Sequence, residues 1–455
     1  MQSSPPDNGQ SAVSKDLLGL RKRLIELVLM APVPAVVNLL IMWLLARFTS
    51  QPWHGIYFLI PLAVLTWILW QVVKARKQFV LRGPFMAFFV CYVLIFSIAA
   101  GSSLLEGKRT TLAGYEHGVS RNFLSLNWLG DWRYALVRKK PAPQNFTLLT
   151  MKRAETVEEG RATLRSLIRM SRMTGARGIV LDFYLKRNAA VPQLDASLCE
   201  EIAAAKSNNV PVLIGYTFER IGGSIHRVET APALQPCLPL ESHGHLVGVQ
   251  EWDELVRYVP LHFKGDPALP ALSLRMAKLM AGPESKISEP RNALLQFVAS
   301  ENPLTTARFE DLLADPRQRM ILRDQFILVG EEGETDRAQT PFGDLPGVKI
   351  HAYATLSLLQ NCFIERTSWW SGFLAILVFS YLLTALVAQG TGARELLGLL
   401  VAISLGALAV AALAMYAWLV WVDVIYFVTA IWLLFFLLAA LRKYASVGPP
   451  RPTAG

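Results

Sequence analysis

Asp336, Thr340, Gly347 and His351 lie close together in the sequence, with a Pro-Phe-Gly turn at residues 341–343. A carboxylate, a hydroxyl and an imidazole at this spacing can contact a small polar ligand. The same side chains can instead bond backbone groups that a tight loop leaves unpaired. Both interpretations, ligand contact and loop architecture, are open. The residues match no acid–base or nucleophile set, so we expect that the protein is not an enzyme.

Three more charged residues are candidates for a ligand-binding or switch role. Asp182 ends a short apolar run, and the carboxyl ends of buried parallel strands open into a crevice where ligands bind. The alternative for Asp182 is a cap on the following loop. Asp253 and Arg257 are four residues apart. We expect them to form a surface ion pair, which contributes about 0–1 kcal/mol to stability.

The sequence Glu241-Ser-His243-Gly-His245 is the one metal-like cluster. Alternate residues of an extended chain face the same side, so the two imidazoles can in principle chelate a metal. A structural zinc site usually has four ligands, and no cysteine lies nearby in the sequence. We therefore expect a polar loop here, with neither a metal nor a cofactor.

Cys199 and Cys237 lie in the long central block of ordinary composition. An oxidising compartment outside the cytoplasm permits a disulfide between them. Two buried free thiols are the alternative, because sequence spacing does not fix the geometry of a disulfide.

The composition predicts which elements hold these candidate residues in place. The 455 residues are 53% hydrophobic and only 18% charged. A soluble domain is about a quarter charged, so these values indicate a membrane protein. Each uncharged stretch is about long enough to cross a hydrocarbon layer of about 30 Å. Six stretches contain no Asp, Glu, Lys or Arg: Leu27–Ala46, Phe48–Val73, Gly83–Leu105, Thr367–Ala393, Leu396–Val422 and Val424–Leu441.

Short-loop cations predict the orientation of these spans. Lys and Arg cluster before residue 27, at residues 74–82, at Arg394 and after residue 441. Cytoplasmic loops carry this excess, so both termini are predicted to be cytoplasmic. If the cell is a Gram-negative bacterium, the membrane is the inner membrane and residues 106–366 lie in the periplasm. The net charge of +10 is thus a topology signal, and we expect no nucleic-acid partner. The predicted spans carry no mid-membrane carboxylate or cation, which argues against a transporter.

The predicted organisation has five parts, with three membrane helices on each side of an extracytoplasmic α/β domain. They are a cytoplasmic arm (1–26), three spans (27–105), the outer domain (106–366), three spans (367–441) and a short cytoplasmic tail (442–455).

Hydrophobic patterning predicts a mostly parallel sheet in the outer domain, because strands and helices alternate. The first half is expected to contain strands at Asn145–Lys152, Gly178–Tyr184 and Val210–Phe218, with helices at Glu158–Met173 and Ala196–Ala205. The second half is expected to contain a hairpin (Leu246–Glu251 and Arg257–Phe263), helices at Pro270–Leu279, Phe309–Ala314 and Val348–Leu359, and strands at Leu294–Ala299 and Asp324–Gly330. Pro270 is expected at the first helical position.

The segment from Arg323 to Glu365 carries a family resemblance. It contains Arg-Asp-Gln-Phe-Ile-Leu-Val-Gly, then Asp336, Thr-Pro-Phe-Gly, Pro-Gly-Val-Lys-Ile-His-Ala and Leu358-Leu359. This order resembles the end of the second type of CHASE domain, the extracellular sensor of bacterial cyclases, histidine kinases and protein kinases. Residues 175–182 and 252–260 resemble earlier motifs of that family.

The sequence departs from the family at several points. Met151-Lys152 stands where an acidic residue is expected, and Glu254 replaces the glycine of a turn. Three predicted spans precede the domain where most members have one. The catalytic output domain that normally follows the last span is not expected here.

The resemblance implies a sensor that detects an extracytoplasmic small molecule or envelope state. Its expected partners are the lipid bilayer and a separately encoded cytoplasmic or membrane signalling protein. The alternative is a membrane-integral effector or scaffold whose spans carry the activity and whose outer domain regulates it.

Overall fold

The computed structural model describes residues 110–112, 127–186, 191–221, 224–251, 253–263, 270–291, 293–333, 336–367, 374–376, 378–380, 382–383, 386 and 392–446. The first three predicted spans, and most of the fourth, lie outside these residues. One compact unit consists of Leu105–Arg366 together with Ala412–Trp421.

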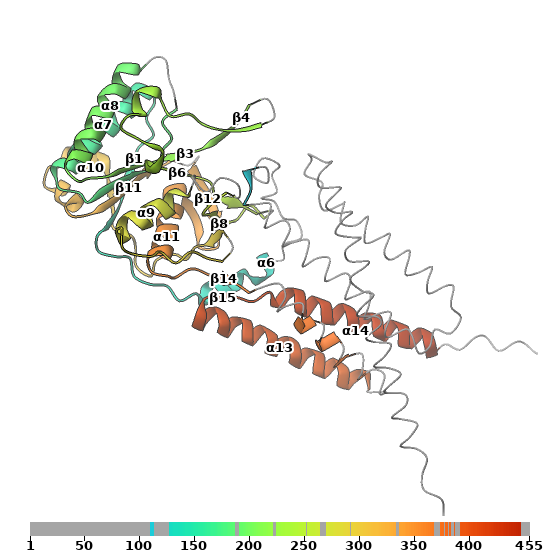
Figure 1. Cartoon of the computed structure of the whole chain (residues 1–455). Helices are drawn as coiled ribbons and strands as arrows, with labels where there is room; N and C mark the ends of the chain where they lie inside the picture. The colour runs from blue at the N-terminus through green and yellow to red at the C-terminus, as the bar shows by residue number, and fades with distance from the viewer. Residues whose placement is uncertain are drawn as a thin grey trace, which may run out of the picture. The chain divides into compact units, whose positions relative to one another are not determined.

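A six-stranded sheet forms the centre of this unit (Figure 1). Every neighbouring pair in it is parallel, so the prediction of an α/β domain with a mostly parallel sheet is confirmed. The strand order is β10 (Thr306–Arg308), β1 (Phe146–Met151), β11 (Phe326–Glu331), β2 (Gly178–Leu181), β3 (Val212–Tyr216) and β6 (His243–His245).

Helices cover both faces of the sheet because its strands are apolar on both sides. Leu149, Ile179 and Ile327 share one core with helices α7 (Val157–Met173), α8 (Pro192–Ser207) and α10 (Phe309–Ala314). The alternate residues Leu148, Val180 and Leu328 face helices α9 (Leu272–Ala281) and α11 (Gly347–Leu359).

A second, antiparallel sheet packs on the far side of α9 and α11. It consists of β7 (Val249–Gln250), β8 (Val256–Pro260) and β9 (Leu294–Gln296). Ile350, Ala354 and Leu358 of α11 pack in a core with Val259 and Leu295 of this sheet. Helix α11 is therefore enclosed between two sheets, which explains why its sequence is apolar around most of its circumference.

The ends of α7 agree with its local sequence. Thr156 caps the helix, because its side chain accepts a hydrogen bond of 3.1 Å from the Glu159 backbone N–H. Gly175 follows the helix with φ of +78°, a left-handed conformation that glycine adopts without strain.

The predicted position of Pro270 is wrong. Helix α9 begins at Leu272, and Ala271 is its N-cap. The Pro270 carbonyl instead accepts a hydrogen bond of 3.0 Å from the His245 N–H, and Ala271 pairs with His245 in a parallel bridge. Pro270 is thus held at the sheet edge, and it is α8 that has proline in its first turn.

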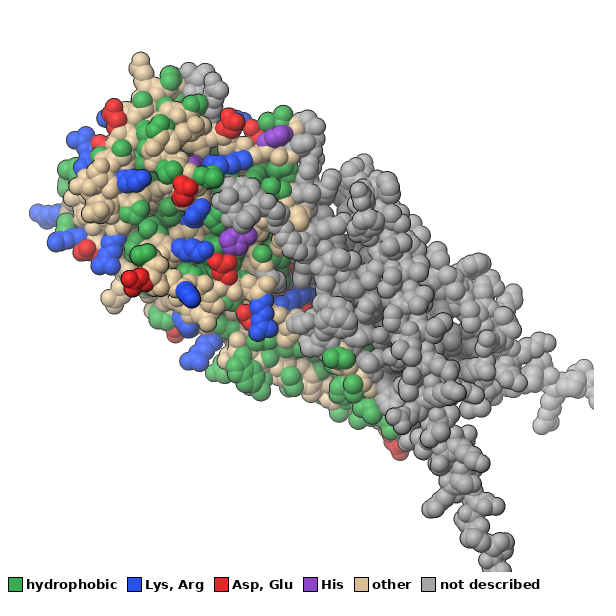
Figure 2. Space-filling model, viewed as in Figure 1, with side chains coloured by type: hydrophobic (Ala, Val, Ile, Leu, Met, Phe, Trp, Pro, Cys, Tyr) green, Lys and Arg blue, Asp and Glu red, His purple; other side chains and the backbone are tan. Residues whose placement is uncertain are grey.

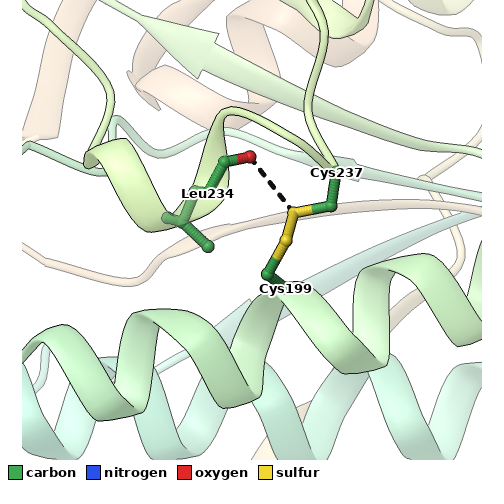
Figure 3. Close-up of a disulfide and its surroundings, with 3 residues drawn as sticks. All are labelled: Cys199, Leu234 and Cys237. Carbon is green, nitrogen blue, oxygen red and sulfur yellow. Dashed lines mark hydrogen bonds between the residues drawn. A yellow bond between two sulfur atoms is a disulfide. The ribbon is translucent and has the colours of Figure 1, made fainter.

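A disulfide joins Cys199 of α8 to Cys237, with a Cα–Cα distance of 5.6 Å (Figure 3). It connects the helix layer to the loop after the short 3₁₀ helix η2 (Pro232–Leu234). Such a bond stabilises a fold by about 2–4 kcal/mol, mainly by restricting the unfolded chain.

Peptide mapping of the full-length protein without reduction is expected to recover Cys199 and Cys237 in one linked pair. Cys362, which is buried and free, serves as the internal control and should be alkylated after denaturation. Alkylation of both Cys199 and Cys237 in non-reduced protein would refute the bridge.

Two short strands next to the predicted membrane segments also pair within this unit. Glu365–Arg366 (β14) lies parallel to Val420–Trp421 (β15). The Trp421 side chain is only 2% exposed, and the Arg133 guanidinium lies over its ring at 3.7 Å from the centroid. Arg133 belongs to the 3₁₀ helix η1 (Asp131–Leu136). Residues from three distant parts of the chain thus meet around one tryptophan.

One described helix, α13 (Ala393–Trp418), is long and apolar enough to cross a membrane. A further apolar helical stretch covers Val424–Phe436 at the start of α14 (Val424–Ser446). Figure 2 shows hydrophobic side chains gathered along α13, whereas charged side chains of both signs are interspersed on the visible face of the domain. The exposed apolar residues of α13 are Leu397, Leu399, Val401, Leu405, Val410, Leu413, Tyr416 and Trp418.

Candidate functional site

A cleft of about 730 Å³ lies where strands β2 and β11 end. Asp182 follows β2 and Glu331 ends β11, and these strands are neighbours in the sheet. Asp336, Gly347 and His351 reach the same cleft from the loop before α11 and from its first turns. Four of the residues singled out in the sequence therefore meet at the carboxyl edge of the sheet, where α/β proteins bind ligands.

Asp182 is the most buried acid of the cleft, with a side chain 6% exposed. Burial, and then the negative charge of Glu331, raise the pKa of Asp182 from 3.8 to about 7. Among the described residues, its nearest ionisable neighbour of opposite type is His351, whose Nε2 is 3.9 Å away. That distance is too long for a hydrogen bond. Within the described part of the chain, the carboxyl group thus has no strong partner.

Asp336 lies against the first residue of α11. A Cβ added to Gly347 would be 2.9 Å from both carboxylate oxygens of Asp336, so only glycine allows this approach. Burial first, and then the charge of Asp182, raise the pKa of Asp336 to about 6. The partial positive charge at the start of α11 favours the ionised form of Asp336.

His351 is 5% exposed and is neutral at physiological pH. Burial lowers the pKa of His351 to about 4, although the charge of Asp336 acts in the opposite direction. The contact between Asp182 and His351 is consequently not an ion pair at pH 7. The imidazole presents polar atoms to the cleft without adding a positive charge.

A family model of the CHASE2 domain matches residues 118–386, more than half of the chain. The chain belongs to the CHASE2 domain family. The resemblance found in the sequence is thereby confirmed, and CHASE2 is a family of extracellular sensory domains. No curated protein and no solved structure matches the chain significantly.

Thr340 has an architectural role in the CHASE2 domain. Its hydroxyl donates a hydrogen bond of 2.7 Å to the Gly343 carbonyl and accepts one of 3.1 Å from the Phe342 N–H. These bonds close the hairpin of β12 (Arg337–Thr340) and β13 (Gly343–Pro346), whose strands pair antiparallel. Thr340 does not line the cleft, and its position agrees with the loop interpretation.

Asp253 and Arg257 do form an ion pair, but the prediction that this pair lies on the surface is wrong. The Arg257 side chain is 0% exposed and contacts three carboxylates. It donates hydrogen bonds of 2.5 Å to Glu251 and of 2.6 and 2.9 Å to Asp253, and both Nε and Nη2 bond Asp131. Burial alone lowers the pKa of Arg257, but these hydrogen bonds more than offset it and the pKa rises.

Asp131 and Glu251 are the partners that sequence reasoning missed. Asp131 lies in η1, which contacts Arg257 across 126 positions of the chain. Glu251 is only 1% exposed at its side chain. The buried Arg257 group does not line the cleft, so it fixes the domain's structure instead of contacting a ligand there.

The expectation of a polar loop at Glu241–His245 is also wrong, because His243–His245 is the buried edge strand β6. His243 Nε2 is 3.0 Å from Thr230 Oγ1, and His243 Nδ1 is 3.0 Å from the Pro239 carbonyl. His245 packs against the ring of Phe263 at 4.8 Å. In the part of the chain that the structure describes, no three His, Cys, Asp or Glu side chains are placed to hold one metal ion.

Proposed function

We propose that the protein is a receptor of the bacterial inner membrane. Its CHASE2 domain binds a small ligand in the cleft at Asp182, Asp336 and His351, and the membrane helices pass this event to a separate signalling partner. The observation that carries the proposal is the buried carboxyl group of Asp182, which lines the cleft with no hydrogen bond to it from a described side chain. A buried polar group without a partner destabilises the empty domain, and a ligand that bonds it removes that cost.

Helix α11 is the element that can transmit binding. Its first residue contacts Asp336, and its 13 residues span about 20 Å between the two sheets. Strand β14 follows shortly after α11 and leads to the predicted fourth span at residue 367. A packed helix moves as one body, and a ligand that favours one of its two arrangements by about 1–3 kcal/mol suffices to change their populations.

The proposed topology has both termini in the cytoplasm, three spans on either side of the domain, and the domain outside. The loop cations, the apolar surface of α13 and the Cys199–Cys237 disulfide support it. The partner is then reached from the cytoplasmic side, for example at the basic loop 74–82.

Photo-crosslinking from Lys77 in living cells is expected to capture a specific second protein. Replacing Gly347 with alanine displaces the Asp336 carboxylate, so Gly347→Ala should change the crosslinking yield about threefold or more. Gly160→Ala is the matched control, because a Cβ at Gly160 meets only Ala154, at an ordinary contact distance of 3.5 Å.

Equal yields for Gly347→Ala and Gly160→Ala, at equal abundance in the membrane, would contradict signalling through α11. Ion conduction by the purified protein alone in lipid vesicles would favour the alternative in which the spans carry the activity.

A further inference from the structure

The floor of the cleft carries negative charge that the described protein does not neutralise. Besides burial, the charge of Glu331 raises the pKa of Asp182, and the charges of Asp182 and Glu331 raise the pKa of Asp336. In the described residues, none of the three carboxyl groups accepts a hydrogen bond from a lysine or arginine. The one imidazole close to them, His351, is neutral at physiological pH.

Basic side chains at the cleft wall are engaged elsewhere. Arg161 donates a hydrogen bond of 2.6 Å to the buried Asp195 and another of 3.1 Å to the Lys186 carbonyl. The Lys186 ammonium bonds Glu219 at 2.7 Å. Arg153 is exposed at the cleft's rim. The positive charges of Arg161 and Lys186 are therefore committed to other carboxylates, and the floor of the cleft stays acidic.

The walls also offer apolar surface. Val157, Phe183 and Leu246 line the cleft together with its polar groups. A volume of about 730 Å³ is in the range of small-molecule sites and exceeds what a bare ion fills. Apolar walls around an acidic floor suit a molecule with a hydrocarbon part and a positively charged end.

We propose that the cleft binds a small organic cation whose ammonium or guanidinium group donates hydrogen bonds to Asp182 and Asp336. The inference rests on the proposed sensory function and names the chemical class of its ligand. The cation's N–H groups supply the donors that the described residues do not offer to either carboxylate. Charge-assisted bonds of this kind are about twice as strong as neutral ones. The hydrocarbon part of the ligand packs against Phe183 and Leu246.

Binding also gives the ligand its effect on α11. A cation between Asp182 and Asp336 draws the Asp336 carboxylate, which lies against Gly347, toward Asp182. The start of α11 then has different contacts in the liganded and the empty domain, which is the differential interaction that a population shift requires.

Isothermal titration of the full-length protein in nanodiscs at pH 8 tests the ligand class. The probes are putrescine, spermidine, agmatine and arginine amide, with glutamate as an anionic probe and Ca²⁺ as a bare cation. At least one organic cation is expected to bind, and Asp182→Asn and Asp336→Asn should each raise its Kd tenfold or more. Glu284→Gln removes one exposed carboxylate outside the cleft and should leave the Kd within about twofold.

The inference is overturned if none of the four organic cations binds, if both cleft variants bind like the wild type, or if only Ca²⁺ binding depends on the two carboxylates. A different outcome would reject the sensor proposal. In that case a cation binds in the cleft, but adding it does not alter crosslinking from Lys77. If no cation binds while Gly347→Ala still alters crosslinking, the ligand class alone is wrong.

Discussion

Replacing Arg257 with leucine is expected to lower the free energy of unfolding of the CHASE2 domain by about 3–5 kcal/mol. The substitution leaves Glu251, Asp253 and Asp131 close together without their shared cation, and Glu251 is almost fully buried. An uncompensated buried charge costs more than the lost hydrogen bonds alone. Thermal unfolding of the purified full-length protein measures the effect, and we expect a fall in Tm of roughly 10 °C.

Arg308→Leu is the matched control, because Arg308 pairs with Glu332 on the surface, where both side chains are about half exposed. We expect a change within about 1 kcal/mol there. If Arg257→Leu and Arg308→Leu shift Tm equally, Arg257 does not hold the buried carboxylates together.

Replacing Asp182 with asparagine is expected to stabilise the protein at pH 8 and to have a much smaller effect at pH 4.5. The folded state keeps the Asp182 proton up to a pKa of about 7, whereas the unfolded chain loses it near 3.8. Between these values the native state binds more protons than the unfolded state, so stability falls as pH rises. Asparagine does not titrate and removes that fall, a gain on the order of 3 kcal/mol at pH 8.

The measurement is the difference in Tm between variant and wild type at the two pH values. His351, His245 and His243 have lowered pKa values and oppose the trend, but they are present in both proteins and largely cancel in the difference. Glu284→Gln should show no such pH-dependent gain. If the Tm difference between Asp182→Asn and wild type is more negative at pH 8 than at pH 4.5, a partner holds Asp182 in its ionised form. Stabilisation together with weaker ligand binding is the behaviour of a residue kept for function.

Much of the outer domain was predictable because its elements are encoded locally. Mostly apolar runs identify β1, β2, β3 and β11, and helix α10 has the predicted bounds, Phe309–Ala314. The exceptions are positions whose local structure is determined by segments far away in the sequence. Pro270 looks like the start of a helix, but its carbonyl bonds a strand 25 residues earlier. Likewise, His243–His245 has a loop-like composition and becomes a strand because β3 offers it a partner edge.

The candidate site was predictable residue by residue but not as a group. The end of an apolar run identifies Asp182, and the family motif identifies Asp336, Gly347 and His351. Their meeting depends on β2 lying beside β11, a pairing between segments about 150 positions apart. The prediction of the partners of Arg257 was incomplete for the same reason, because Asp253 is near Arg257 in the sequence whereas Asp131 is not. Spacing reveals a pair, but only the tertiary fold reveals how deeply it is buried.

The pairing of β14 with β15 determines where the domain can be cut for separate production. A fragment ending at Arg366 lacks Trp421 and Met415, which pack with Tyr134, Val298 and Ile364. Such a fragment would expose that apolar cluster and leave β14 with an open edge, two features that promote aggregation. A soluble version of this domain is better made by joining residues 412–421 to it through a designed linker, because that piece of chain completes its packing.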